Sequence, residues 1–199
     1  DWFLGKDVLI DFFSFLVLLA FFVLTIKNYK MDKNKKLLYL GVGFGMIAFS
    51  QLSSILTKLV LYYDTSFTQK IGQMILTSHI ISSVDILYHT GFFFYRCLTL
   101  LGLYVIYKLP MEESRWGDFS LVSFFIIMIS LLSKDMIYLF TLTSFVLLIM
   151  IIKNYYLVYY RKKSPNTLVL VAGFSILALS NLILLFSWSE SMYVFGNFV

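Results

Sequence analysis

Long apolar stretches separated by short clusters of charge constrain this chain more than any other feature. Residues 164–189, for example, contain no charged side chain. A predominantly apolar run of about 18 residues or more is typical of a helix that spans a membrane, because a helix satisfies its own backbone polar groups in lipid. Hydrophobic residues make up 60% of the 199 residues, against roughly 45–50% in soluble domains. The sequence therefore predicts an integral membrane protein.

Hydropathy and the position of charged residues between the apolar runs predict an all-α, polytopic transmembrane helix bundle with six spans and the start of a seventh near Ser191. The fourth span is the weakest of these predictions, because its apolar part is short. The six spans are expected at about residues 8–26, 37–63, 84–108, 118–133, 136–159 and 167–188.

Between the second and third spans, an outer interfacial helix is expected near 64–83, with an extension of the third span as the alternative. The chain begins with Asp1 and ends on an apolar segment, so we expect it to be part of a longer protein.

Lysine and arginine gather in the loops that follow the first, third and fifth spans. By the positive-inside rule these loops are expected to be cytoplasmic, in a plasma or cell membrane. The N-terminus then lies on the outer side of that membrane. The net charge of +5 is thereby explained by topology, and no nucleic-acid partner needs to be invoked. The basic residues are Lys27, Lys30, Lys33, Lys35 and Lys36, then Lys108 and Arg115, then Lys153, Arg161, Lys162 and Lys163.

Three short segments recur in the same order, which predicts an internal repeat. "IKNY" at Ile26 recurs at Ile152, "GFGMIAFSQL" at Gly43 resembles "GFSILALSNL" at Gly173, and "DILYHTG" at Asp85 resembles "ESMYVFG" at Glu190. We interpret "IKNY" as the point where the first and fifth spans leave the membrane, with its tyrosine in an aromatic belt. Convergence of two apolar hairpins on similar letters is the alternative.

The predicted organisation is two parallel three-helix repeats joined by a linker helix, or 3+1+3. The first repeat covers residues 1–110, the linker helix 111–135, and the second repeat 136–199, with its last helix incomplete. In helix order alone this arrangement resembles the SWEET-type sugar transporters.

Ionisable and polar side chains inside the spans predict an outward-facing ligand or ion cluster. Asp85, His89 and Arg96 share one face of the third span. A charge in the bilayer costs roughly 2.5–3.5 kcal/mol even on lenient scales, so we expect Asp11 and Asp85 to offset Lys58 and Arg96. The full candidate set is Asp11, Gln51, Lys58, Asp85, His89 and Arg96. The competing interpretation is a purely structural set of interhelical ion pairs and hydrogen bonds.

Glycines at close spacing predict tight helix packing. Gly41 and Gly45 form a GxxxG pattern, and Gly43 recurs as Gly173, so we expect close packing of the second span against the sixth or against a partner chain.

No catalytic or metal-binding pattern stands out. HExxH, GxSxG and cysteine clusters are missing from the sequence, and the two histidines, His79 and His89, lie in one segment, which disfavours a haem held between helices. We therefore predict no cofactor and no metal, and do not favour an enzyme.

The favoured function is a non-enzymatic, receptor-like sensing or partner-binding seven-helix module. A small transporter or channel is the first alternative, and an accessory subunit of a larger membrane complex is the second. The expected partners are the lipid bilayer and other membrane subunits or a second copy, together with a small ligand of unknown identity.

Overall fold

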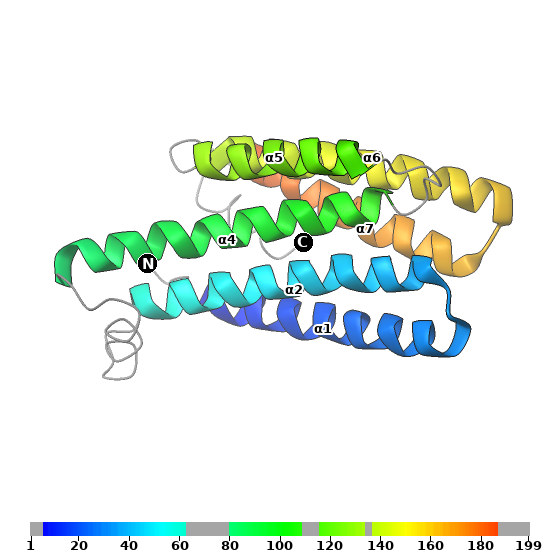
Figure 1. Cartoon of the computed structure of the whole chain (residues 1–199), viewed down its shortest axis with the longest axis horizontal. Helices are drawn as coiled ribbons and strands as arrows, with labels where there is room; N and C mark the ends of the chain where they lie inside the picture. The colour runs from blue at the N-terminus through cyan, green and yellow to red at the C-terminus, as the bar shows by residue number, and fades with distance from the viewer. Residues whose placement is uncertain (1–5, 63–79, 109–115, 134–136, 187–199) are drawn as a thin grey trace.

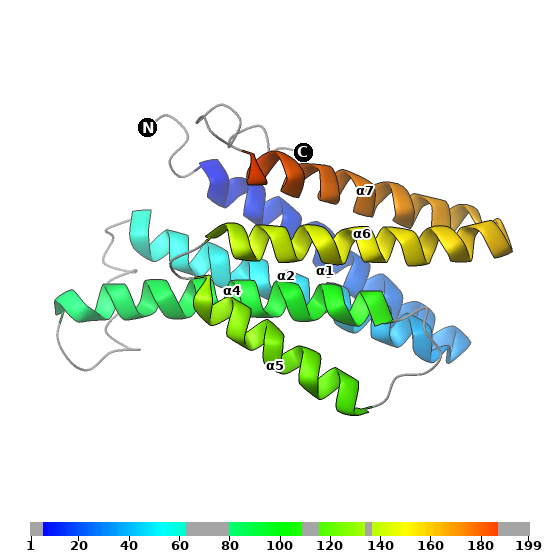
Figure 2. The same cartoon turned by 90° about the horizontal axis from the view of Figure 1, so that it is seen from above.

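The computed structural model describes residues 6–62, 80–108, 116–133 and 137–186. Its helices run side by side as an elongated bundle (Figures 1 and 2), and no strand occurs in these ranges. The prediction of an all-helical bundle is confirmed. The helices are α1 (Lys6–Asp32), α2 (Lys35–Tyr62), α4 (Ile80–Lys108), α5 (Trp116–Leu132), α6 (Ile137–Lys162) and α7 (Pro165–Leu185).

Five of these helices, all except α5, are long and apolar enough to cross a membrane. The apolar part of α5, Phe119–Leu132, is shorter, in line with the weak prediction for the fourth span. Length and composition are thus compatible with a multi-pass membrane protein. The seventh helix expected near Ser191 and most of the segment at 64–83 lie outside the described residues, and from Ile80 onward the chain belongs to α4.

Several helices extend beyond their apolar cores. α1 continues to Asp32 and α6 to Lys162, each past the end predicted from hydropathy. Hydropathy marks where apolar side chains stop, whereas a helix continues as long as its backbone hydrogen bonds do. Both "IKNY" segments therefore lie inside helices. Tyr155 is buried against Phe174 with ring centroids 6.0 Å apart, so the expected aromatic belt position is wrong for this copy.

Two hairpin turns, one between α1 and α2 and one between α6 and α7, have matching geometry. Lys33 and Lys163 have positive φ angles of 49° and 48°, the left-handed conformation that commonly ends a helix. Each donates its backbone N–H to a tyrosine carbonyl at 2.7 Å, that of Tyr29 or of Tyr159. The next helix then begins at once, with Pro165 at the first turn of α7, where its missing N–H costs nothing.

The helices pack in the order α1, α2, α4, α6 and α7, with α5 against both α4 and α6. α2 is the most enclosed of the five long helices, because α1 and α4 pack on its two sides. The larger core joins the two hairpins through side chains of α2, α4, α6 and α7; a smaller one, which includes Cys97, lies between α4 and α5. The larger core is formed by Leu40, Phe44, Leu103, Ile106, Leu148, Ile151, Tyr155, Phe174 and Ala178.

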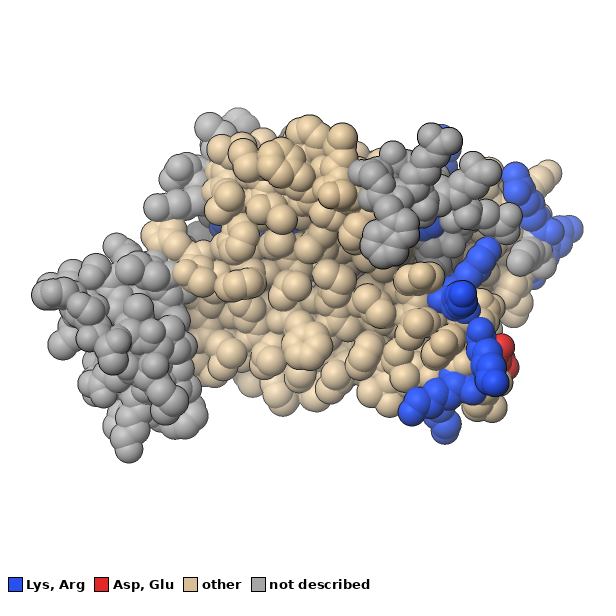
Figure 3. Space-filling model, viewed as in Figure 1, with Lys and Arg blue, Asp and Glu red and all other residues tan. Residues whose placement is uncertain are grey.

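Charge is distributed unevenly along the bundle. On the face shown in Figure 3, lysine and arginine gather mainly at the end that carries the two hairpin turns, and the sides are largely uncharged. Large apolar side chains are exposed on these sides, for example Phe13 on α1 and Val169 on α7. An apolar girdle with one basic end is what a bilayer accommodates.

Candidate functional site

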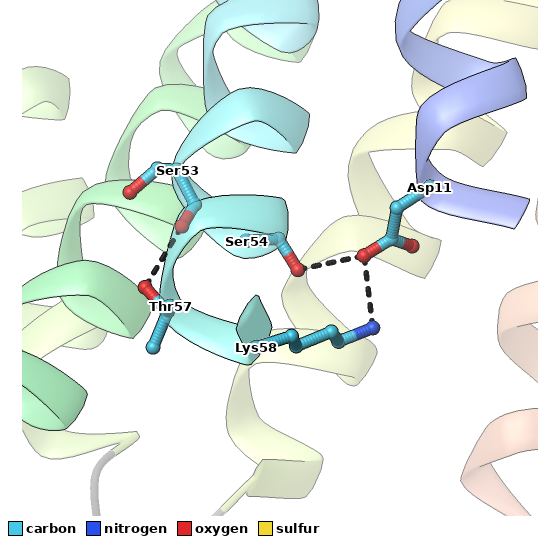
Figure 4. A network of polar contacts seen from close by, with 5 residues as sticks. All are labelled: Asp11, Ser53, Ser54, Thr57 and Lys58. Atoms are coloured by element: carbon cyan, nitrogen blue, oxygen red, sulfur yellow. Dashed lines mark hydrogen bonds and ion pairs between the residues drawn. The ribbon is translucent and has the colours of Figure 1, made fainter. Parts of the chain in front are cut away.

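An ion pair joins α1 to α2 in the half of the bundle away from the basic turns. The Lys58 ammonium donates to Asp11 Oδ2 at 2.8 Å, and the Ser54 hydroxyl donates to the same oxygen at 2.9 Å (Figure 4). The side chains of Lys58 and Asp11 remain 15% and 19% exposed. A carboxylate with one ammonium and one hydroxyl donor is well satisfied for a partly buried site.

The sequence places these donors together by helical spacing. Ser54 and Lys58 lie four residues apart in α2, so their side chains are one above the other on one face. Asp11 reaches this face from the first half of α1, which runs antiparallel to α2. Two of the predicted cluster residues, Asp11 and Lys58, are thus in direct contact. Ser54, which helical spacing puts on the same face as Lys58, is a third member that the candidate set did not include.

Other hydroxyl groups of α2 tie this helix to α4. Ser53 Oγ donates to the Gly91 carbonyl at 2.9 Å, and farther along the same interface Thr99 Oγ1 donates to Ser50 Oγ at 2.8 Å. Thr57 Oγ1 donates to the Ser53 carbonyl within α2 at 2.8 Å (Figure 4). A Cβ atom on Gly91 would collide with Thr57, so glycine permits the close approach. Small residues and interhelical hydroxyl bonds are the usual means of helix association in membranes.

Arg96 lies in a different environment from Asp11 and Lys58. Its Nη1 donates to Ser133 Oγ at 3.2 Å, at the end of α5, and Ser133 in turn donates to the Ser130 carbonyl at 2.9 Å. The face of α4 that carries Arg96 thus meets α5, whereas Asp11 and Lys58 lie between α1 and α2.

The single cluster expected from the sequence is therefore divided, because α4 presents one face to α2 and another to α5. Arg96 is not offset by Asp11. His89 lies one heptad before Arg96 in α4 and is half-buried. The Asp85 side chain lies outside the described part of the structure, so its expected pairing stays a prediction.

Gln51 lies on α2 between two heptad neighbours, Phe44 and Lys58, which places the three on one face. Its side chain is half-buried and forms no hydrogen bond with the described residues. Gln51 thus lies on the same face of α2 as Lys58 but does not take part in the hydrogen bonds around Asp11.

The glycines pack against helices other than the expected one. A Cβ atom on Gly41 or Gly45 would approach Thr25 or Phe22 of α1, at 2.7 and 2.9 Å. On Gly43 it would meet Ile106 of α4 at 2.5 Å. On Gly173 it would have nothing within 4 Å. The expected close packing of α2 against α7 through these glycines is therefore wrong, since the backbone contacts of α2 are with α1 and α4.

No group of three or more His, Cys, Asp or Glu side chains lies close enough to hold a metal ion in the part of the chain that the structure describes.

The geometry defines a structural class, an apolar helical bundle with polar contacts between its helices. Comparison with protein-family models, with curated proteins and with solved structures gave no match to this chain.

Proposed function

We propose that this chain is a non-enzymatic, receptor-like membrane module that senses a ligand or a partner at its outer end. The proposal places the N-terminus outside the cell, the basic turns in the cytoplasm and the described helices within a seven-span, 3+1+3 bundle. The observation that carries it is the Asp11–Lys58 ion pair. It lies roughly 35 Å along α2 from the basic turn, at about 1.5 Å per residue, and is partly exposed.

The ion pair holds a helix that is otherwise weakly enclosed. α1 buries the smallest share of its span among the five long helices. Toward the basic end it is held by the glycines of α2, and toward the other end by Asp11. A ligand carboxylate that binds Lys58, or a ligand amine that binds Asp11, would compete with the pair and free the outer part of α1. Such a ligand shifts a conformational equilibrium through its differential contacts with the two states.

Ligand-dependent thermal stability tests this proposal. The protein in lipid nanodiscs is heated with and without small carboxylates, amines and phosphate, alongside the variants Asp11→Asn and Lys58→Met. A sensing site gives a shift in melting temperature with one charge class, and that shift disappears in both variants. Loss of stability in the variants, with no response of the wild type to any charge class, supports the purely structural interpretation and contradicts the proposal.

A small transporter is the second candidate, favoured by the matching hairpin turns at Lys33 and Lys163. Parallel repeats in transporters place substrate sites at the interface between the repeats. Uptake of a broad set of solutes into proteoliposomes tests this candidate. Accumulation above that of protein-free vesicles supports it, and its failure across the set counts against it.

A further inference from the structure

The two hairpins share one register, which is set by their turns. Lys163 follows Lys33 by 163 − 33 = 130 positions, and the turn hydrogen bonds recur at the same separation. Identical residues also recur at this separation along both helices: Ser14 with Ser144, Phe15 with Phe145, Leu18 with Leu148, Phe44 with Phe174, Ala48 with Ala178 and Ser50 with Ser180. The two "IKNY" segments are 152 − 26 = 126 positions apart, so they are offset by about one turn from equivalent places.

Equivalent phenylalanines from the two hairpins touch each other. Phe44 and Phe174 are both buried, and their rings stack nearly parallel, with centroids 6.4 Å apart and an interplanar angle of 3°. Contact between equivalent residues is what two copies related by a local two-fold axis produce. Phe44 and Phe174, with Leu148 and Ile151 of the same core, form what we call the aromatic layer.

A polar layer lies two turns beyond the aromatic layer, farther from the basic end. Ser14 and Ser144 are each 19 residues from the turn lysine of their own hairpin, and Gln51 and Asn181 are each 18 residues from it. The four residues, one each from α1, α2, α6 and α7, are therefore at one depth. We call them the polar layer.

The side chains of the polar layer point toward the space between the hairpins. Ser144 is 2% exposed, and Leu18, one turn from Ser14, packs on the core that joins the hairpins. Gln51 and Asn181 are seven residues from Phe44 and Phe174, which places each amide on the face that carries the stacked ring.

These polar groups keep unused hydrogen-bonding capacity. Ser144 Oγ is buried with no partner in the structure, and Gln51 forms no hydrogen bond with the described residues. Asn181 Nδ2 donates to the Leu177 carbonyl at 2.9 Å, which leaves its own carbonyl oxygen available. An unsatisfied polar group in an apolar interior is unfavourable, so a group that supplies the missing bonds is favoured here.

We propose that the polar layer is a binding site for a small uncharged solute that both donates and accepts hydrogen bonds. Amides and hydroxyls offer both functions without charge. Within two residues of this depth, α1, α2, α6 and α7 carry no charged side chain, and Arg96 of the neighbouring α4 donates to Ser133 of α5, so these four helices offer a bound ion no counter-charge. This site takes residues from both hairpins and goes beyond the sensing role of the ion pair.

Cysteine accessibility tests the site even while the natural ligand is unidentified. In a Cys97→Ser background, Ser14→Cys, Ser144→Cys, Gln51→Cys and Asn181→Cys are each treated in lipid nanodiscs with a small, uncharged, hydrophilic methanethiosulfonate. Phe49→Cys and Leu179→Cys are matched controls, because Phe49 and Leu179 lie two residues from Gln51 and Asn181 and are exposed on the outer surface of the bundle. Both serine variants are near-isosteric, so they report on the site even if an amide variant folds poorly.

We expect the polar-layer cysteines to react at least about tenfold faster than the controls, because a solute site admits a small polar reagent whereas the control positions lie on the outer apolar surface. Glycerol and urea, which are neutral donors and acceptors, should slow this reaction, whereas acetate and methylammonium of similar size should not. Reaction at the polar layer that is no faster than at Phe49→Cys and Leu179→Cys overturns the site. Equal protection by the charged solutes overturns the assignment of an uncharged ligand.

Discussion

Asp11 accepts two hydrogen bonds from α2, one from the Lys58 ammonium and one from the Ser54 hydroxyl. In a membrane the alternative to these bonds is a charge without a partner in an apolar environment. At the scale of single residues, this carboxylate holds the N-terminal half of α1 against α2. Replacing either charge leaves the other in the same environment without its counter-charge.

We predict that Asp11→Asn and Lys58→Met each lower the free energy of unfolding by about 1–3 kcal/mol, because each leaves one charged partner unpaired. The double variant should lose less than the sum of the two single losses, since neither charge is then stranded. Unfolding in mixed micelles with increasing dodecyl sulfate measures the three values. Lys27→Met, at an exposed position of the basic end, is the control and should change little. Additive losses at Asp11 and Lys58 would show that the two side chains do not interact.

At the scale of helices, hydropathy located all six described helices, but it did not determine which helices pack against each other. Rise per residue could place Asp11 within reach of Lys58, although somewhat deeper in the bundle. Which face of α4 meets α2 and which meets α5 depends on how the helices cross, and one sequence does not determine this crossing. The contact of Arg96 with Ser133 of α5 and that of Gly43 with α4 were therefore not predicted. Ser144 could have been found from its match with Ser14, 130 positions earlier. Aligning the two halves on "IKNY", whose copies are 126 positions apart, shifted the alignment and hid this match.

The α2–α4 contact provides a matched pair of glycine variants. A Cβ atom on Gly102 would lie 2.8 Å from the Gly43 carbonyl oxygen, whereas Gly173 has open space. Gly102→Ala should therefore force the two helices apart and lower stability by about 1–3 kcal/mol. Gly173→Ala should cause no loss, since alanine favours a helix by up to about 1 kcal/mol over glycine. Thermal unfolding of both variants in nanodiscs measures the difference, and equal losses would contradict the close α2–α4 packing.

The hairpin turns provide a second matched pair of variants. A β-branched residue is strongly disfavoured at positive φ, and the left-handed conformation costs roughly 1–2 kcal/mol. Lys33→Val and Lys163→Val should therefore destabilise the protein by similar amounts, while asparagine at either position is tolerated. Lys30→Val, inside α1, controls for the loss of a lysine charge. If only one turn responds to valine, the two turns do not share their geometry under native conditions.

At the scale of the whole molecule, two hairpins face each other across an aromatic layer, with α4 and α5 packed alongside. The backbones of α2 and α7 do not approach each other in the described part of the chain, so large side chains bridge them. The polar layer lies between the same hairpins, beyond the stacked rings. Both the proposed solute site and the proposed transport alternative depend on this facing of α2 and α7.

Site-specific photocrosslinking at the aromatic layer tests the facing of the hairpins most directly. p-Benzoylphenylalanine replaces Phe174 in the protein in nanodiscs, and Ile176, which is exposed on the outer surface of α7, is the matched control position. Mass spectrometry locates the crosslinked residue, and a mixture of isotopically labelled and unlabelled protein separates links within one chain from links between copies. The account predicts that position 174 links to α2 around Phe44 within one chain, whereas position 176 links to lipid. Links from both positions to lipid alone, or from position 174 only to a second copy, would contradict it.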